Sequence, residues 1–135
     1  MRKILFRGYD EEESHWVYGD LLQYRILLPV IFDKDKVQHE VSANSVGQFT
    51  GLTDRLGKEI YEGDLLQWSD ESGLASTVYY EVFYDDGNGV NSNGFKCSRT
   101  HYKGSRCGGY IPPFNHVSFE EMIVIGNIYE NSDLL

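Results

Sequence analysis

The stretch Gly51–Asp64 reads GLTDRLGKEIYEGD, and its three glycines and four acidic residues decide how the chain folds around it. Both residue types favour tight turns, because glycine adopts positive φ and an aspartate carboxylate accepts hydrogen bonds from nearby backbone N–H groups. Asp54–Gly57 therefore predicts a turn, with Gly57 at the position of positive φ that three-residue hairpin loops require. We expect Lys58–Tyr61 to return as a strand, and Glu62–Asp64 to form a second tight turn or bulge.

The same stretch suggests an alternative, a catalytic carboxylate site built from Glu59, Glu62 and Asp64. Residues two apart on a strand share a face, so Glu62 and Asp64 could converge. A general acid–base pair, however, needs one carboxyl group in an apolar pocket. Gly63 between them favours an exposed turn, in which Asp64 accepts backbone hydrogen bonds. We therefore expect Gly57, Gly63 and Asp64 to be structural turn residues and to do no chemistry.

Strand patterns occupy much of the remaining chain. Thr77–Tyr84 (TVYYEVFY) is the clearest, being almost entirely β-branched and aromatic. Met122–Tyr129 (MIVIGNIY) indicates a buried strand with a kink at its Gly-Asn pair, and Pro29 limits Arg25–Phe32 to an edge strand or a bulge. Ser42–Gly47 predicts a single helical turn. Shorter strands are expected at Ile4–Gly8, His15–Tyr24, Val37–Val41, Gln48–Leu52 and Leu65–Trp68.

No segment shows the 3.6-residue period of a helix, so the fold class is all-β, with at most short helical turns. The acidic run Asp10–Glu13 indicates a solvated turn, and the glycine-rich Phe95–Tyr110 indicates irregular structure. A length of 135 residues fits one domain, 1–135. Apolar residues make up 41% of the chain and charged residues 24%, which is typical of a globular protein.

The charge balance disfavours two classes of partner. Twelve basic and twenty-one acidic residues leave a net charge of −9. Phosphate backbones and anionic membrane surfaces attract the opposite sign, so we expect neither nucleic-acid nor membrane binding. The basic residues concentrate only at Arg2, Lys3, Arg7 and residues 99–106.

Compartment and metal binding follow from the ends of the chain and from its cysteines. No apolar run approaches the ~20 residues of a membrane span. The apolar part of the start, MRKILFRGYD, is too short for an export signal, so we expect a cytoplasmic protein. In that compartment we expect the two cysteines to be free thiols. Cys97, His101, Cys107 and His116 supply the ligand types of a tetrahedral zinc site but lack the short Cys-x2–4-Cys spacing of structural zinc. We expect no metal, no cofactor and no enzymatic activity, and keep this set as the alternative of a metal-dependent enzyme.

Four segments of the chain are distinctive when taken together: RKILFRGYD (2–10), WVYGDLLQ (16–23), SVGQFTGLTDRLGKEIYEGDLLQW (45–68) and VIGNIYENSDLL (124–135). Together they resemble the YopX-like family of small phage and prophage proteins. The resemblance implies an all-β fold in which an N-terminal β segment (1–47) packs with an SH3-type barrel-like part (48–135). It also implies a phage or prophage origin and therefore a bacterial host cell. It implies no activity, because the family is of unknown function.

Three functional hypotheses remain. The first is a non-enzymatic β module that binds another protein or assembles with itself, since SH3-type barrels present shallow aromatic surfaces. Candidates for such a surface are Trp16, Tyr18, Trp68, Tyr79 and Tyr84, although most aromatic residues of a small barrel are expected in its core. The second is an acidic host-directed inhibitor that imitates the charge of DNA. The third is the metal-dependent enzyme.

Overall fold

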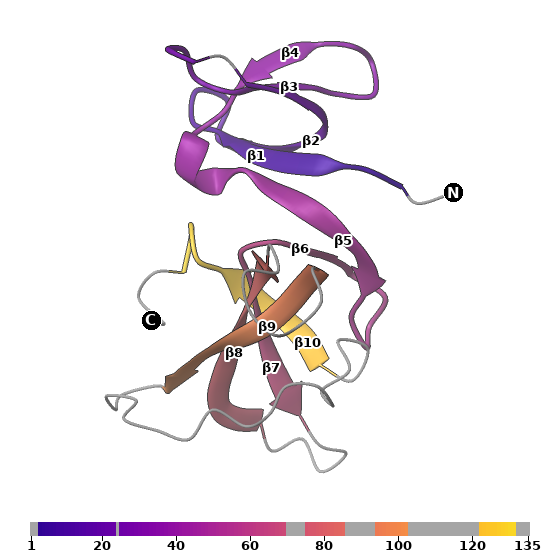
Figure 1. Cartoon of the computed structure of the whole chain (residues 1–135), viewed down its shortest axis with the longest axis vertical. Coiled ribbons are helices and arrows are strands. Elements are labelled where there is room, and N and C mark those ends of the chain that lie inside the picture. Colours follow the sequence, from indigo (N-terminus) through magenta and orange to yellow (C-terminus); the bar gives the residue numbers. More distant parts are fainter. Residues whose placement is uncertain (1–2, 24, 70–74, 86–93, 103–121, 132–135) are drawn as a thin grey trace. The chain divides into compact units, whose positions relative to one another are not determined.

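The computed structural model describes residues 3–23, 25–69, 75–85, 94–102 and 122–131 (Figure 1). The chain forms two compact units, Met1–Gly51 and Leu52–Leu135. Strand β5 (Gly47–Thr53) spans the boundary between these units, and the expected division into 1–47 and 48–135 stays a prediction.

The all-β prediction is confirmed. The described strands are β1 (Phe6–Asp10), β2 (His15–Leu22), β3 (Val30–Phe32), β4 (Gln38–Glu40), β5, β6 (Glu59–Tyr61), β7 (Asp64–Ser69), β8 (Ala75–Asp85), β9 (Gly94–Tyr102) and β10 (Met122–Asn127). The helical turn expected in Ser42–Gly47 is the 3-10 turn η1 (Ala43–Ser45). Its end is fixed by Ser45, whose hydroxyl donates to the Ser42 carbonyl and accepts from the Tyr9 N–H. Within the described ranges, no helix is long and apolar enough to cross a membrane.

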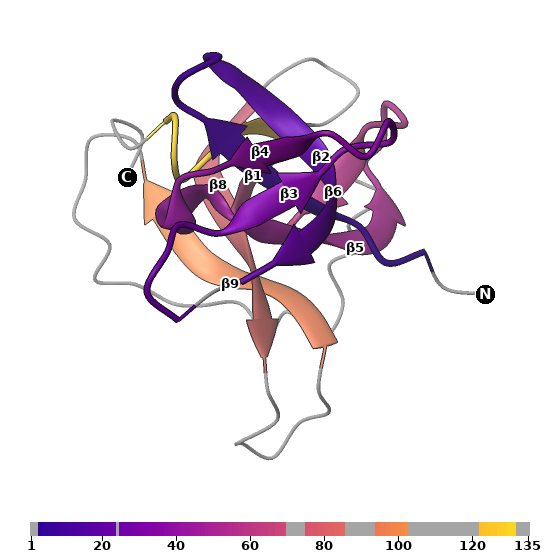
Figure 2. The ribbon, with the colours of Figure 1, turned by 90° about the horizontal axis from the view of Figure 1, so that it is seen from above.

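The first unit is an antiparallel sheet in which β4, β3, β2, β1 and the start of β5 lie in that order (Figure 1), and Figure 2 looks onto this sheet from the side of β4. Its core consists of Val17, Ile31 and Val41, one from each of three neighbouring segments. Gly19 allows β2 and β3 to approach, because a Cβ at this position would lie 1.8 Å from the carbonyl oxygen of Phe32. Glycine in a strand is typical of such close backbone contact.

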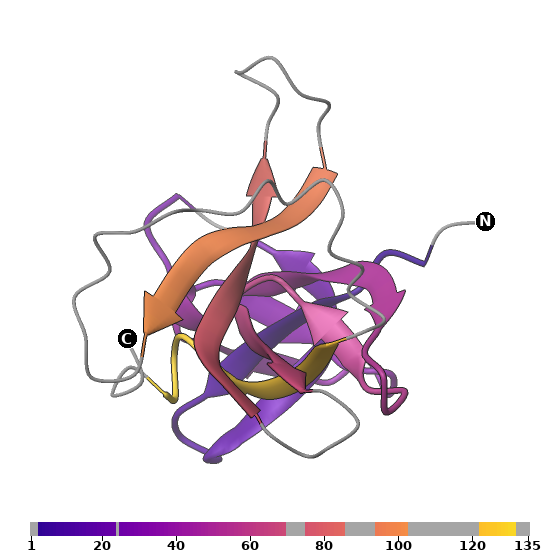
Figure 3. The ribbon, with the colours of Figure 1, turned by 90° about the horizontal axis from the view of Figure 1, so that it is seen from below.

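The second unit contains a twisted antiparallel sheet with the order β10-β7-β8-β9 (Figure 3, with β9 in orange and β10 in yellow). Its core packs Ile60, Leu66, Val82 and Met122 together. The kink expected in Met122–Tyr129 is present as a register shift between Val124 and Gly126. Among the described residues β9 and β10 remain the outer strands of this sheet, so the SH3-type barrel stays a prediction.

Two carboxylates organise the Gly51–Asp64 stretch. Gly57 has φ +86° and closes the first turn by donating its N–H to the Asp54 carbonyl. The Asp54 side chain accepts from the backbone N–H groups of Leu56, Lys58 and Val124, at 2.8, 2.9 and 2.9 Å. Asp54 is therefore the buried centre of this turn and ties it to β10.

The second turn is also built around a buried carboxylate. Gly63 has φ +91°, donates its N–H to the Val82 carbonyl, and accepts from Ile128. The Asp64 carboxylate accepts the Tyr61 N–H at 2.7 Å and is only 1% exposed. The expectation that Asp64 lies in an exposed turn is wrong. The two hydrogen bonds of Gly63 hold this turn against β8 and against the residues after β10, and Asp64 is buried there.

Three further expectations are corrected. Phe95–Tyr110 is not irregular throughout, since β9 pairs with β8 from Gly94 opposite Asp85 to Tyr102 opposite Val78. The mostly polar composition of β9 does not predict a strand, but its pairing with β8 stabilises one. Arg25–Phe32 forms a strand only over β3, after Pro29. The run Asp10–Glu13 is not wholly solvated, because Asp10 ends β1 and is buried.

Candidate functional site

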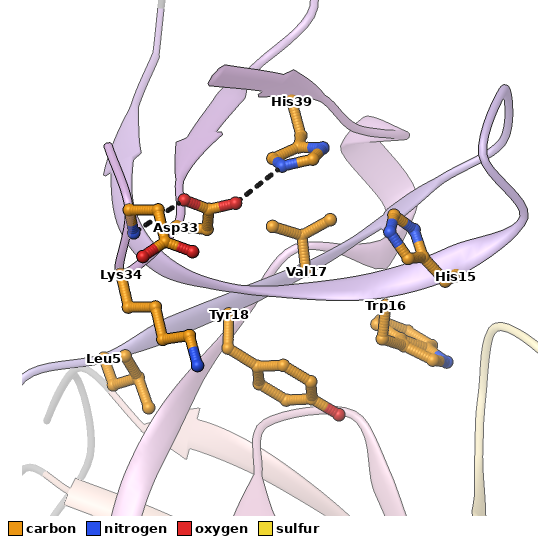
Figure 4. A pocket seen from close by; sticks show the side chains of 9 residues that line it. Leu5, His15, Trp16, Val17, Tyr18, Asp33, Lys34 and His39 are labelled. Atoms are coloured by element: carbon orange, nitrogen blue, oxygen red, sulfur yellow. Dashed lines mark hydrogen bonds and ion pairs between the residues drawn. The ribbon is translucent and has the colours of Figure 1, made fainter. Parts of the chain in front are cut away.

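A pocket of about 390 Å³ opens beside β2 in the first unit (Figure 4). Its position follows from the sheet order, because β2 is flanked by β1 and β3 and the turn after β3 folds beside it. The pocket is lined by Leu5, His15, Trp16, Val17, Tyr18, Asp33, Lys34, Asp35 and His39. It therefore combines an apolar and aromatic wall with a charged rim.

The aromatic wall consists of Trp16 and Tyr18, which share one face of β2 (Figure 4). Trp16 is held in place, since its ring makes an edge-to-face contact with Tyr9 at 5.4 Å and lies 4.6 Å from the guanidinium carbon of Arg7. Tyr18 is 46% exposed, and Lys34 extends toward it. The wall thus has a rigid part and an accessible part, which suits contact with an apolar group.

His39 stands between two carboxylates at the other side of the pocket. Its Nδ1 lies 3.2 Å from Oδ2 of Asp10, and its Nε2 lies 3.0 Å from Oδ2 of Asp33. Because both ring nitrogens face carboxylate oxygens, the doubly protonated imidazolium satisfies both contacts, whereas a neutral ring can donate only one. We call this group of three residues the His39 clamp.

Charge and hydrogen bonding shift the pKa values of the clamp in consistent directions. The hydrogen bond with Asp33 raises the pKa of His39 above its ordinary value of 6.5, and Asp10 raises it further against the opposing effect of burial. The hydrogen bond from His39 lowers the pKa of Asp33, followed by that from the Val37 N–H. The pKa of Asp10 is lowered first by the Glu13 N–H and then by His39, also against burial.

The clamp joins two turns that are distant in sequence. Asp10 Oδ1 accepts the Glu13 N–H at 3.0 Å in the β1–β2 turn. Asp33 Oδ1 accepts the N–H groups of Asp35 and Val37 at 2.9 and 3.0 Å in the β3–β4 turn. His39, on β4, therefore fixes both turns through carboxylates that already organise them.

Both ring nitrogens of His39 are occupied in this arrangement. A general base needs a ring nitrogen that reaches a substrate proton, whereas both nitrogens of His39 are engaged by carboxylates. The ring of His15 also contacts that of His39, edge to face, with the two centroids 5.8 Å apart. Among the described residues no group of three or more His, Cys, Asp or Glu side chains is arranged to hold a metal ion.

The structure brings together two of the five aromatic residues expected to form a binding surface. Trp16 and Tyr18 both line the pocket, whereas Tyr84 belongs to the second unit and is 46% exposed. Trp68 and Tyr79 lie on β7 and β8, at positions where the structure describes the backbone alone. A common surface for all five therefore stays a prediction.

The proposed zinc set is only partly within the described residues. Cys97 and His101 lie on β9, opposite Val82 and Tyr79 of β8. Cys107 and His116 lie outside the described residues. The expectation that no metal binds here, and the zinc set as its alternative, therefore both stay predictions.

The His39 clamp was missed in the sequence. In the sequence, Asp10 precedes His39 by 29 residues and Asp33 precedes it by 6. Asp10 is the last residue of β1, Asp33 lies in the turn after β3 and His39 lies on β4, and no local spacing relates them. One signal was available in the sequence. Acidic and basic residues alternate in Asp33-Lys-Asp-Lys36, which predicts a polar turn, and the carboxylate of its first residue can reach the strand that follows.

The comparisons with known proteins address identity. The search of curated proteins found no match. The family whose sequence model matches is described as "YopX protein", and the match covers residues 5–135, nearly the whole chain. The chain therefore belongs to the YopX family.

Proposed function

We propose that this chain is a non-enzymatic binding module of a bacteriophage or prophage, which acts in the cytoplasm of the bacterial host and holds a protein partner at the pocket beside β2. The phage origin follows from what the family resemblance implies. The binding role is carried by one observation, the accessible Tyr18 beside the fixed Trp16 in a pocket of about 390 Å³. Ligand pockets of this kind have volumes of about 300–1,000 Å³ and are mainly apolar with a few polar groups.

The chemistry of the pocket favours a peptide segment with an apolar side chain. Leu5, Trp16 and Tyr18 offer an apolar surface to such a side chain (Figure 4). Lys34 and Asp35 at the rim can pair with the polar backbone or with charged neighbours of that side chain. Aromatic residues and a charged rim are typical of protein interfaces.

The hydrogen bonds of four carboxylates support a non-enzymatic role. Asp54 and Asp64 accept hydrogen bonds from backbone N–H groups, and Asp10 and Asp33 hold His39 as well as their own turns. These groups stabilise turns, and a catalytic acid or base would have to be released from such partners before it could transfer a proton.

The test places a photo-crosslinking phenylalanine analogue at position 18 and, in a separate variant, at Leu56. Leu56 is an exposed apolar residue of the second unit and serves as the matched control. In cells that carry the phage or prophage, we expect one discrete protein adduct from position 18 and none of the same mass from position 56. With the purified partner, Tyr18→Ala should weaken binding by about tenfold, which corresponds to about 1.4 kcal/mol. Identical adducts from both positions, or unchanged affinity of Tyr18→Ala, would contradict the proposal.

Self-assembly is the second candidate, and the position of β4 favours it. In the described sheet of the first unit β4 (Gln38–Glu40) is the outer strand. An outer strand presents backbone N–H and C=O groups that a second chain can pair with. Size-exclusion chromatography with light scattering tests this candidate, and a monomer at all concentrations rejects it.

A further inference from the structure

The connection between β2 and β3 exposes three consecutive large apolar side chains. Ile26 is 92% exposed, Leu27 63% and Leu28 53%. Single exposed apolar residues are common on protein surfaces, but a contiguous group marks an interaction site. The adjoining Pro29 is buried and its carbonyl accepts the Val41 N–H, so the end of this connection is anchored to the sheet.

An acidic cleft adjoins this apolar group. The cleft has a volume of about 270 Å³ and includes Leu28, Glu11, Glu12 and Glu40 in its lining. The three glutamates are exposed, whereas the neighbouring Asp10 is buried and occupied by His39 and the Glu13 N–H. Leu28 therefore belongs both to the apolar group and to a cleft of negative charge. The surface formed by these side chains, which we call the Leu28 surface, comprises Ile26, Leu27, Leu28, Glu11, Glu12 and Glu40.

We infer that the Leu28 surface docks a basic amphipathic segment of a partner protein. The apolar face of that segment lies on Ile26, Leu27 and Leu28, and its lysine or arginine side chains enter the cleft beside Glu12 and Glu40. Complementary charge directs the choice of partner, and apolar burial contributes most of the affinity. This surface shares no lining residue with the pocket beside β2, so the inference stands without the proposed function.

Charge also argues against two other occupants. A bilayer with anionic lipids repels the glutamates that border the apolar group. If this surface paired with itself in a second copy, its three glutamates would face the same three glutamates, which disfavours that contact. Arg25 is the cation within the same connection, and it is outnumbered by Glu11, Glu12 and Glu40.

The test uses synthetic peptides with the full-length protein. A labelled amphipathic peptide of leucine and lysine at helical spacing is titrated by fluorescence anisotropy, beside a leucine–glutamate peptide and a scrambled leucine–lysine peptide. We expect saturable binding of the first peptide alone. Ile26→Ser combined with Leu27→Ser should weaken it by about tenfold or more, as for other interface anchors. Leu56→Ser, the matched exposed control, should leave it unchanged.

The charge arm replaces Glu12 and Glu40 by glutamine, with Asp20→Asn on the exposed face of β2 as control. The glutamine variant should bind several-fold more weakly at about 0.1 M salt and almost as wild type at about 1 M salt, where the Debye length falls from about 10 Å to about 3 Å. Circular dichroism verifies that each variant is folded. Equal binding of ordered and scrambled peptides, or equal loss in Leu56→Ser, overturns the inference. So does a dimer that Ile26→Ser dissociates, or binding to phosphatidylserine vesicles, because either result identifies a different occupant.

Discussion

Nε2 of His39 lies 3.0 Å from Oδ2 of Asp33, and this contact links β4 to the turn that precedes it. Asp10 engages the other ring nitrogen, so His39 can donate a hydrogen bond to both carboxylates only when its ring is doubly protonated. Protonation of His39 therefore stabilises the first unit. The pKa of His39 is raised by folding, so its stabilising effect is complete below 6.5 and is lost as pH rises through the folded-state pKa. The pKa values of the two aspartates are lowered by folding, so their effect on stability has the opposite pH dependence. It is complete above pH 3.8 and is lost as the pH falls through their lowered pKa values.

The first prediction concerns this pH dependence. Wild type should exceed His39→Asn in thermal stability at about pH 5.5, and the difference should shrink as the pH rises through the raised pKa of His39, because the imidazolium loses its proton there. Melting curves of both proteins across this range measure the difference. His15→Asn is the control, since His15 contacts the His39 ring but neither carboxylate of the clamp in the described contacts. A pH profile of His39→Asn parallel to that of wild type would show that the clamp does not act as described.

The second prediction concerns Asp54, which joins its own turn to β10. Asp54→Ala leaves the N–H groups of Leu56, Lys58 and Val124 without their acceptor. Leu56 and Lys58 are exposed, so water can replace the carboxylate at their N–H groups, whereas Val124 is half-buried. We expect the free energy of unfolding to fall by about 1–3 kcal/mol. Urea denaturation measures the loss. Asp20→Ala, at an exposed position, should change it by less than about 0.5 kcal/mol, and an equal effect of the two would refute the assignment.

The third prediction contrasts two glycines. Gly19→Ala places a Cβ 1.8 Å from the Phe32 carbonyl oxygen, a backbone atom that cannot rotate away. We expect this variant to lose about 4 kcal/mol or to fail to fold. Gly57→Ala meets no atom within 4 Å and suffers only from its φ of +86°, which costs about 1–2 kcal/mol. Comparison of the two melting temperatures decides the point, and Gly57→Asn should recover part of the loss because asparagine tolerates positive φ.

The strands were predictable where composition and pairing agree. β8 is β-branched and aromatic, and the kink of β10 falls at Gly126 because glycine and asparagine interrupt an otherwise apolar run. β9 was not predictable, since most of its residues are polar and its conformation depends on the ladder with β8. Local propensity is a weak guide when a neighbouring strand supplies the hydrogen bonds.

The candidate site was predictable only in its aromatic part. Trp16 and Tyr18 lie two residues apart on a strand, so their common face follows from the sequence. The His39 clamp depends on the order of β1 to β4, which brings Asp10 and Asp33 to opposite sides of one ring. The burial of Asp64 likewise depends on β8 and the residues after β10, which hold Gly63 from either side.

The last prediction separates binding from stability within the aromatic wall. Trp16 packs against Tyr9 and Arg7, so Trp16→Ala should lower the free energy of unfolding by about 3 kcal/mol. Tyr18 is half exposed on the same strand, and Tyr18→Thr retains strand propensity, so its stability should stay within about 0.5 kcal/mol of wild type. The same Tyr18→Thr protein should nevertheless lose the partner adduct or the affinity measured with the purified partner. If Tyr18→Thr binds as well as wild type while Trp16→Ala is merely unstable, the aromatic wall serves the fold alone and the pocket beside β2 is not the binding site.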